Sequence, residues 1–304
     1  MEFLEWLAQL RTPLLDKLML GITYLGSEIA FLVIALIVFW CVDKRKGYYI
    51  LSVGFLGTIL NQFMKLWFRV PRPWLLRPGF QPVEGAAADA GGYSFPSGHT
   101  QNSVGTFGCV ARTIAQRSVK IAAIALAVLV SFSRMYLGVH TPADVLTAAV
   151  LAVGLVYLVK PVVMGNDGKY FPILIGGMLV IALAFLLFVE IYPFPADIQA
   201  ENLYSGKKNA YTLFGCLLAL IPAYIADRKW MHFSEKAVWW AQILKVVLGL
   251  ALVLAIKSGL SAPLSRLLGE FTGRAVRYFL MVFFAGFIWP MTFRFFGRLG
   301  KQEN

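Results

Sequence analysis

Long apolar runs separated by short polar stretches make up most of this chain. A helix needs roughly 20 residues to cross a bilayer, and runs close to that length predict a membrane protein built from about nine transmembrane helices. They cover about 23–42, 48–67, 98–116, 119–137, 143–164, 171–192, 210–226, 238–258 and 277–296. The third and seventh runs fit the pattern least well. The predicted fold is therefore an all-α polytopic helix bundle.

The first 22 residues have a different pattern. Apolar residues such as Trp6 and Leu7 alternate with polar ones such as Glu5, up to a break at Pro13. This amphipathic spacing predicts a helix lying in the membrane interface. The segment begins with acidic residues and has no basic leader, so we do not expect a signal peptide.

These patterns suggest a division of the chain into three parts, with no internal repeat. Residues 1–22 would form the interfacial helix, and residues 23–192 a six-span core. Residues 193–304 would add a three-span bundle and a basic cytoplasmic tail.

Composition supports the membrane assignment and narrows the chemistry. The 304 residues are 59% hydrophobic and only 14% charged, with a mean hydropathy of +0.69. A soluble domain is excluded on that balance. The net charge of +12 is scattered over short loops, which argues against nucleic-acid binding. All three cysteines lie in apolar runs, and no C-x-x-C or H-E-x-x-H spacing occurs, so we expect neither a disulfide nor a metal cofactor.

The basic residues predict the orientation of the chain. If successive spans alternate, one end of the bundle carries more lysine and arginine than the other. That end includes the cluster Lys44 to Lys46 and the tail residues Arg294, Arg298 and Lys301. By the positive-inside rule it faces the cytoplasm, and the other end is extracytoplasmic.

Three polar blocks at that other end contain the candidate chemistry. They read K-x6-R-P from Lys65 to Pro73, P-S-G-H from Pro96 to His99, and S-R-x5-H-x3-D from Ser133 to Asp144. Their cations provide donors for a tetrahedral oxyanion, and a hydroxyl and glycine amides stand where a helix is expected to begin. Two of the three histidines, His99 and His140, lie in these blocks and can divide the roles of nucleophile and proton donor.

In this order and spacing, the blocks resemble the signature of the type 2 phosphatidic acid phosphatase superfamily. The resemblance implies a metal-independent phosphatase with a phosphohistidine intermediate. Carried over to this chain, it makes His140 the nucleophile, oriented by Asp144, and makes His99 the proton donor that later activates water. The residues implied in holding the phosphoryl oxygens are Lys65, Arg72, Ser97, Gly98 and Arg134.

Each block also has an ordinary structural explanation. Lys65 closes an apolar run, where lysines commonly anchor a helix at the head groups. Pro96 and Ser97 are typical of any helix start. Asp144 fits the third position of a helix that opens at Thr141, so it stabilises that end, orients His140, or does both. A buried Arg134, in contrast, is costly without an anionic partner, which favours a bound phosphate.

Two loops on the same side are candidates for covering the site. The stretch Val70 to Phe95 joins the first block to the second, and we expect it to act as a lid or gate. The stretch Pro193 to Lys208 is either a second such loop, attracting anions through Lys207 and Lys208, or a solvated connector.

The membrane setting favours a lipid substrate. A site at the membrane surface suits a lipid phosphate or diphosphate of the undecaprenyl diphosphate, phosphatidic acid or phosphatidylglycerol phosphate type. Three alternatives stay open: a sugar-phosphate phosphatase resembling glucose-6-phosphatase, a non-catalytic transporter of anionic lipids, and phosphoryl transfer to a second lipid. A bacterial cytoplasmic membrane is the expected location. The sequence predicts no oligomeric state.

Overall fold

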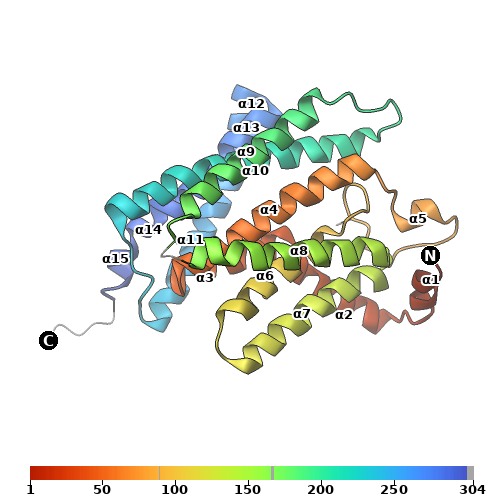
Figure 1. The fold of residues 1–304 in the computed structure, drawn as a ribbon, viewed down its shortest axis with the longest axis horizontal. Helices are drawn as coiled ribbons and strands as arrows, with labels where there is room; N and C mark the ends of the chain where they lie inside the picture. Colours follow the sequence, from red (N-terminus) through yellow and green to blue (C-terminus); the bar gives the residue numbers. More distant parts are fainter. Residues whose placement is uncertain (89, 166–167, 300–304) are drawn as a thin grey trace. The chain divides into compact units, whose positions relative to one another are not determined.

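The structure, a computed structural model, describes all residues except 89, 166–167 and 300–304, so Lys301 of the expected basic tail lies outside the described residues. The described residues form helices and loops without a β-strand, in agreement with the all-α prediction (Figure 1). The α-helices are α1 Glu2–Gln9, α2 Pro13–Thr23, α3 Glu28–Cys41, α4 Lys44–Phe68, α5 Pro73–Leu76, α6 Gly98–Thr113, α7 Arg117–Tyr136, α8 Pro142–Met164, α9 Phe171–Ile191, α10 Ala200–Ala226, α11 Trp239–Gly259, α12 Ser261–Leu268, α13 Glu270–Phe283, α14 Trp289–Met291 and α15 Phe293–Phe296.

Membrane-crossing helices account for most of these elements. Seven helices in the described part of the chain are long and apolar enough to span a bilayer, and an eighth span results if α2 and α3 count as one helix bent by 52°. The expected count of nine is not confirmed. The run at 98–116 gives α6, which has 16 residues and is not among the candidate spans. Its buried face is polar, because protein rather than lipid surrounds it.

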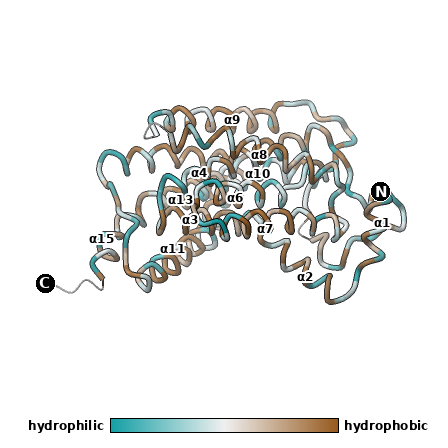
Figure 2. The backbone as a smooth tube through the Cα atoms, turned by 60° about the horizontal axis from the view of Figure 1, so that its bottom comes forward, coloured by the Kyte–Doolittle hydropathy of each residue, from teal (hydrophilic) through white to brown (hydrophobic). Residues whose placement is uncertain are grey.

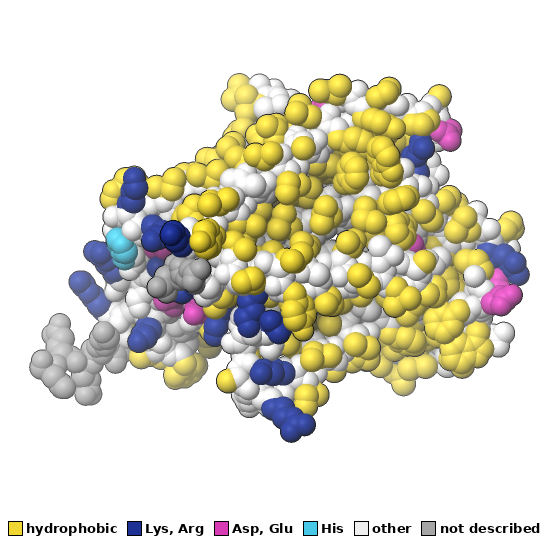
Figure 3. All heavy atoms as spheres, viewed as in Figure 1, with side chains coloured by type: hydrophobic (Ala, Val, Ile, Leu, Met, Phe, Trp, Pro, Cys, Tyr) yellow, Lys and Arg dark blue, Asp and Glu magenta, His cyan; other side chains and the backbone are white. Residues whose placement is uncertain are grey.

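The outer surfaces of the long helices are apolar. Val150 on α8 and Ile173 on α9 are each 71% exposed, which suits contact with lipid tails and not with water. Hydrophobic residues run along most of the helical tube (Figure 2) and cover much of the face drawn in Figure 3.

The chain divides into two compact units. The first comprises Met1–Ile34, Tyr49–Pro161 and Tyr192–Gly206, and the second comprises Ala35–Tyr48, Val162–Ile191 and Lys207–Asn304. All three polar blocks belong to the first unit.

The N-terminal segment folds as two helices, where we expected one interfacial helix over residues 1–22. Helix α1 ends at Gln9, and α2 starts at Pro13, whose missing N–H group suits a first helical position. The Thr12 side chain caps α2 by accepting a hydrogen bond from the Leu15 N–H. Helix α2 then extends to Thr23, beyond the end expected from the sequence.

In the second unit, α10 and α13 pack closely at Gly215. A Cβ atom at this position would overlap the Ala275 carbonyl oxygen and backbone, so only glycine fits. Gly176 on α9 has nothing within 4 Å of the same position.

We predict that Gly215→Ala destabilises the second unit, whereas Gly176→Ala does not. Overpacking at a backbone contact costs about 1–3 kcal/mol, but alanine at an open helical position gains roughly 1 kcal/mol in helix propensity. Thermal unfolding of both purified variants in detergent measures the difference. Equal unfolding temperatures would contradict the close packing at Gly215.

Candidate active site

Four helix ends in the first unit bring the polar blocks together. Lys65 is in the last turn of α4, and Arg72 follows that helix. Ser97 caps the start of α6, Arg134 is in the last turn of α7, and His140 directly precedes α8. A backbone hydrogen bond from Ser97 N to Asp144 O, 3.1 Å long, joins the starts of α6 and α8. Residues distant in the sequence therefore meet at one place.

Arg72 and His140 are in direct contact at the centre of this site. Arg72 Nη1 lies 3.0 Å from His140 Nε2 and also donates to the Val139 carbonyl oxygen at 3.0 Å. A guanidinium group can only donate hydrogen bonds, so Nε2 is the acceptor. The ring proton of neutral His140 is therefore on Nδ1, and the lone pair of Nε2 points toward a cation.

Asp144 lies on the other side of the same ring. Its Oδ2 atom is 3.4 Å from His140 Nδ1 and accepts shorter hydrogen bonds from the Ser94 hydroxyl at 2.6 Å and the Thr141 N–H at 2.7 Å. The Thr141 hydroxyl in turn accepts from the Asp144 N–H at 3.3 Å. This reciprocal pair is a helix-capping arrangement. The helix-start role and the contact with the imidazole are thus present together.

Lys65 is buried and points inward. Its ammonium group donates to the Tyr93 carbonyl oxygen and, at 3.5 Å, to that of Ser94. The alternative of a lysine reaching out to the lipid head groups does not match this position. Arg69, one turn further, turns away toward Asp197, 4.0 Å distant in the loop before α10.

Ser97 and Gly98 form the first turn of α6. The Ser97 hydroxyl accepts a hydrogen bond from the Thr100 N–H at 3.4 Å, and the backbone amides of this turn have no partner within the helix. An ideal Cβ atom on Gly98 would meet only Asn61 Oδ1, at 3.8 Å, so the backbone is approachable. Such a helix start is well suited to an anion.

His99 and Arg134 complete the set. Arg134 is 1% exposed and donates through Nη1 to the Thr23 hydroxyl at 2.8 Å. His99 is electrostatically coupled to Arg134, Arg72 and Lys65, and His140 is coupled to His99. Both imidazoles therefore belong to one cluster with the three cations.

The loop from Val70 to Phe95 closes over this cluster. Arg72 donates to the Gly91 carbonyl oxygen at 2.8 Å and to that of Gly92 at 3.0 Å, and Lys65 donates to the next two carbonyls. Gly92 adopts φ +74°, which favours glycine. The carbonyl oxygens of the loop thus use the donors that the sequence suggests for phosphate.

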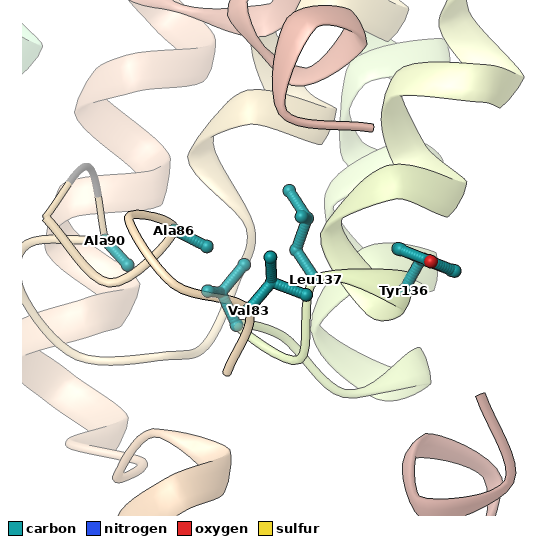
Figure 4. Close-up of a cluster of buried hydrophobic side chains, with 6 residues drawn as sticks. Val83, Ala86, Ala90, Tyr136 and Leu137 are labelled. Carbon is teal, nitrogen blue, oxygen red and sulfur yellow. The ribbon is translucent and has the colours of Figure 1, made fainter. Parts of the chain in front are cut away.

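Apolar contacts fix the outer part of this loop. Val83, Ala86 and Ala90 pack with Tyr136 and Leu137 at the end of α7 (Figure 4), and the Val83 N–H donates to the Leu137 carbonyl oxygen at 3.0 Å. These contacts therefore hold the described outer part of the loop against the end of α7.

Sequence reasoning missed the residues that support the site. Ser94 bonds to Asp144 and Thr23 bonds to Arg134, but neither residue lies in a block. Ser94 stands only two residues before Pro96 of the second block, so its proximity was a usable signal. Thr23 gave none. Among the described residues, no group of three or more His, Cys, Asp or Glu side chains is placed to hold a metal ion.

A histidine beside a carboxylate, next to a cluster of buried cations at the ends of membrane helices, defines the class of integral-membrane phosphatases. Residues 45–167 match the PAP2 superfamily, and residues 211–302 match the transmembrane extension described for PAP2 superfamily phosphatases. The chain belongs to the PAP2 superfamily.

Two curated proteins of Bacillus subtilis (strain 168) are similar to it. Phosphatidylglycerophosphatase B is 32% identical over 164 residues, which is 50% of this chain and 76% of that protein. Undecaprenyl-diphosphatase BcrC is 30% identical over 141 residues, 46% of this chain and 70% of its own length. The crystal structure of a PAP2-type phosphatidylglycerolphosphate phosphatase from Bacillus subtilis is 31% identical, with a TM-score of 0.46 over 55% of this chain and 84% of that one.

The protonation state of His140 follows from its surroundings. Burial, and after it the charges of Arg72 and Arg134, lower the pKa of His140 well below its ordinary value. A lowered pKa means that the ring takes up its proton only at a more acidic pH, so the free enzyme holds His140 neutral at physiological pH. A neutral imidazole is the form that attacks phosphorus.

We predict that His140 stays neutral in the substrate-free protein when the pH falls through about 6.5, the ordinary pKa of histidine. Nitrogen-15 NMR of histidine-labelled protein in detergent measures this, with the His140→Gln variant assigning the signal. Half-protonation of His140 near that pH would contradict the electrostatic description of the site.

Proposed function

We propose that the chain hydrolyses a lipid phosphate or diphosphate through a phosphohistidine at His140. The arrangement of Asp144, His140 and Arg72 in one line of contacts carries this proposal. It holds the proton on Nδ1 and leaves Nε2 to attack, while the cation next to Nε2 marks where a phosphoryl group would bind.

The reaction would proceed in two displacements. His140 Nε2 attacks phosphorus while the bond to the leaving oxygen breaks, and His99 protonates that oxygen. Water then attacks the phosphohistidine, with His99 accepting its proton, and inorganic phosphate leaves. Neutralising the phosphoryl oxygens is the main task of such a site, and we assign it to Lys65, Arg72, Ser97, Gly98 and Arg134.

The position of the site at the ends of membrane helices supports a lipid substrate, since the tail can stay in the bilayer while the head group enters the cluster. The names of the similar Bacillus proteins support a phosphatidylglycerol phosphate or undecaprenyl diphosphate substrate. The first family match lies within residues 23–192 and the second within 193–304. These bounds support the proposed division into a catalytic core over residues 23–192 and a C-terminal bundle over residues 193–304.

We predict that the purified protein releases phosphate from phosphatidylglycerol phosphate, phosphatidic acid or undecaprenyl diphosphate in the presence of a metal chelator. His140→Ala should lower the rate on the order of a thousandfold or more, because it removes the nucleophile. With radiolabelled substrate, an acid-labile phosphoprotein should form in wild type and not in His140→Ala. Phosphate release is measured colorimetrically.

The matched control is His232→Ala, an exposed histidine outside the polar blocks, which should retain the wild-type rate. Equal release by wild type and His140→Ala would refute the catalytic assignment. Exclusive use of a glucose phosphate would refute the lipid preference. Lipid movement across vesicles that is unaffected by His140→Ala, without phosphate release, would identify a transporter.

We further propose that the protein lies in a bacterial cytoplasmic membrane with this site on the extracytoplasmic face. Lys44 to Lys46 are the first residues of α4, at the opposite end of this helix from Lys65. The positive-inside rule therefore places the site outside.

An impermeant maleimide tests this orientation on intact cells. Ala87→Cys, exposed in the loop over the site, should be labelled from outside. Ser234→Cys, exposed between α10 and α11, should react only after lysis. The reverse pattern would place the site on the cytoplasmic face.

A further inference from the structure

The end of α2 contacts the candidate phosphate site. Thr23, the last residue of α2, is 2% exposed, and its hydroxyl accepts the 2.8 Å hydrogen bond from Arg134 Nη1. Both groups are buried, so water competes little for this bond. Thr23 lies outside residues 45–167 and 211–302, which match the family.

The turn after Thr23 approaches a second site residue. Gly26 lies so close to α6 and α7 that a Cβ atom there would be 2.7 Å from the His99 carbonyl oxygen and 2.6 Å from Val130 Cγ1. Real Cβ atoms do not approach so closely, so glycine is needed. Residues 23–26 therefore contact the backbone of His99 and the side chain of Arg134 at once.

Polar contacts further along α2 hold this turn in place. Asp16 Oδ1 accepts a 2.8 Å hydrogen bond from the Tyr136 hydroxyl at the end of α7. Arg11, just before α2, donates to the Tyr136 carbonyl oxygen at 3.3 Å and to that of Gln81 at 2.7 Å. The N-terminal segment is thus fixed to the helix that carries Arg134 and to the covering loop.

We propose that Thr23 is a positioning residue for the phosphate site, acting through Arg134. A guanidinium group is a rigid planar fork, so holding one Nη atom fixes the direction of the remaining donors. A valine in place of Thr23 keeps the volume and removes the acceptor that holds Nη1. This inference rests on the proposed role of Arg134 in binding phosphoryl oxygens.

The test measures binding of orthovanadate, a tetrahedral oxyanion, to full-length protein in detergent by calorimetry, so the readout does not need turnover. Thr23→Val should weaken vanadate binding about tenfold, the size expected for losing a hydrogen bond to a charged group. Thr23→Ser, which keeps the hydroxyl, should bind nearly as wild type. In an Arg134→Ala background, Thr23→Val should have no further effect, because the residue through which it acts is gone.

Thr113→Val is the matched control. The Thr113 hydroxyl donates to Cys109 O within α6 at 2.9 Å, and at 1.5 Å per residue it lies roughly 22 Å along that helix from Gly98. It should leave vanadate binding unchanged. Unfolding temperatures of all variants are recorded, and Thr23→Ala replaces Thr23→Val if the valine variant does not fold.

Each outcome separates the inference from the function on which it rests. Weakened binding in Arg134→Ala together with wild-type binding in Thr23→Val overturns the inference alone. The same is true if Thr23→Val and Arg134→Ala weaken binding independently, or if Thr23→Val lowers only the unfolding temperature. Wild-type binding in Arg134→Ala refutes the proposed role of Arg134, and the inference with it.

Discussion

Burial of positive charge is the constraint on which this site depends. Lys65, Arg72 and Arg134 are almost completely shielded from solvent, and their surroundings supply one buried carboxylate, Asp144, together with neutral oxygens. A charge removed from water is costly unless hydrogen bonds and a counter-charge replace its hydration. Backbone carbonyls accept hydrogen bonds from Lys65 and Arg72, and the Thr23 hydroxyl accepts one from Arg134, but neutral oxygens carry no counter-charge. A phosphoryl dianion would meet both needs, so the cluster favours an anionic ligand before any catalytic group is considered.

The covering loop competes with a phosphate for the same buried cations. The carbonyl oxygens of Gly91, Gly92 and Tyr93 accept hydrogen bonds from the cations that a phosphate would use. A phosphate that binds these cations would therefore replace the loop carbonyls as hydrogen-bond acceptors. In the loop bonds only the donor is charged, whereas in a bond to phosphate both partners are charged, and this Coulombic attraction would offset the loss of the loop contacts. A head group without a phosphate has no such compensation, so the same exchange selects for the phosphorylated lipid.

The sequence predicted the fold class, and it pointed to polar residues that the structure brings together, because both depend on local patterns. The length of an apolar run indicates a membrane helix. The spacing of the charged residues from Lys65 to Asp144 can be read from the sequence without knowing how the helices pack. The run at 98–116 was predicted to be a membrane span, but α6 is not among the candidate spans. Protein surrounds this helix, so its polar buried face does not show where the helix lies in the membrane. Thr23 was unpredictable because it acts through one hydrogen bond set by tertiary packing, and a lone hydroxyl leaves no periodicity. Ser94 is also a lone hydroxyl, and its closeness to the second block was the signal that the sequence offered.

Asp144 links His140, the proposed nucleophile, to the starts of two helices. Its carboxylate caps the start of α8 through the Thr141 N–H and contacts His140 Nδ1 with the same oxygen atom. Its backbone carbonyl receives the Ser97 N–H at the start of α6. The carboxylate that contacts the His140 ring is thus itself fixed at the start of a helix. Because the residue after Ser97 and Gly98 is His99, the same hydrogen bond ties the proposed proton donor to the nucleophile.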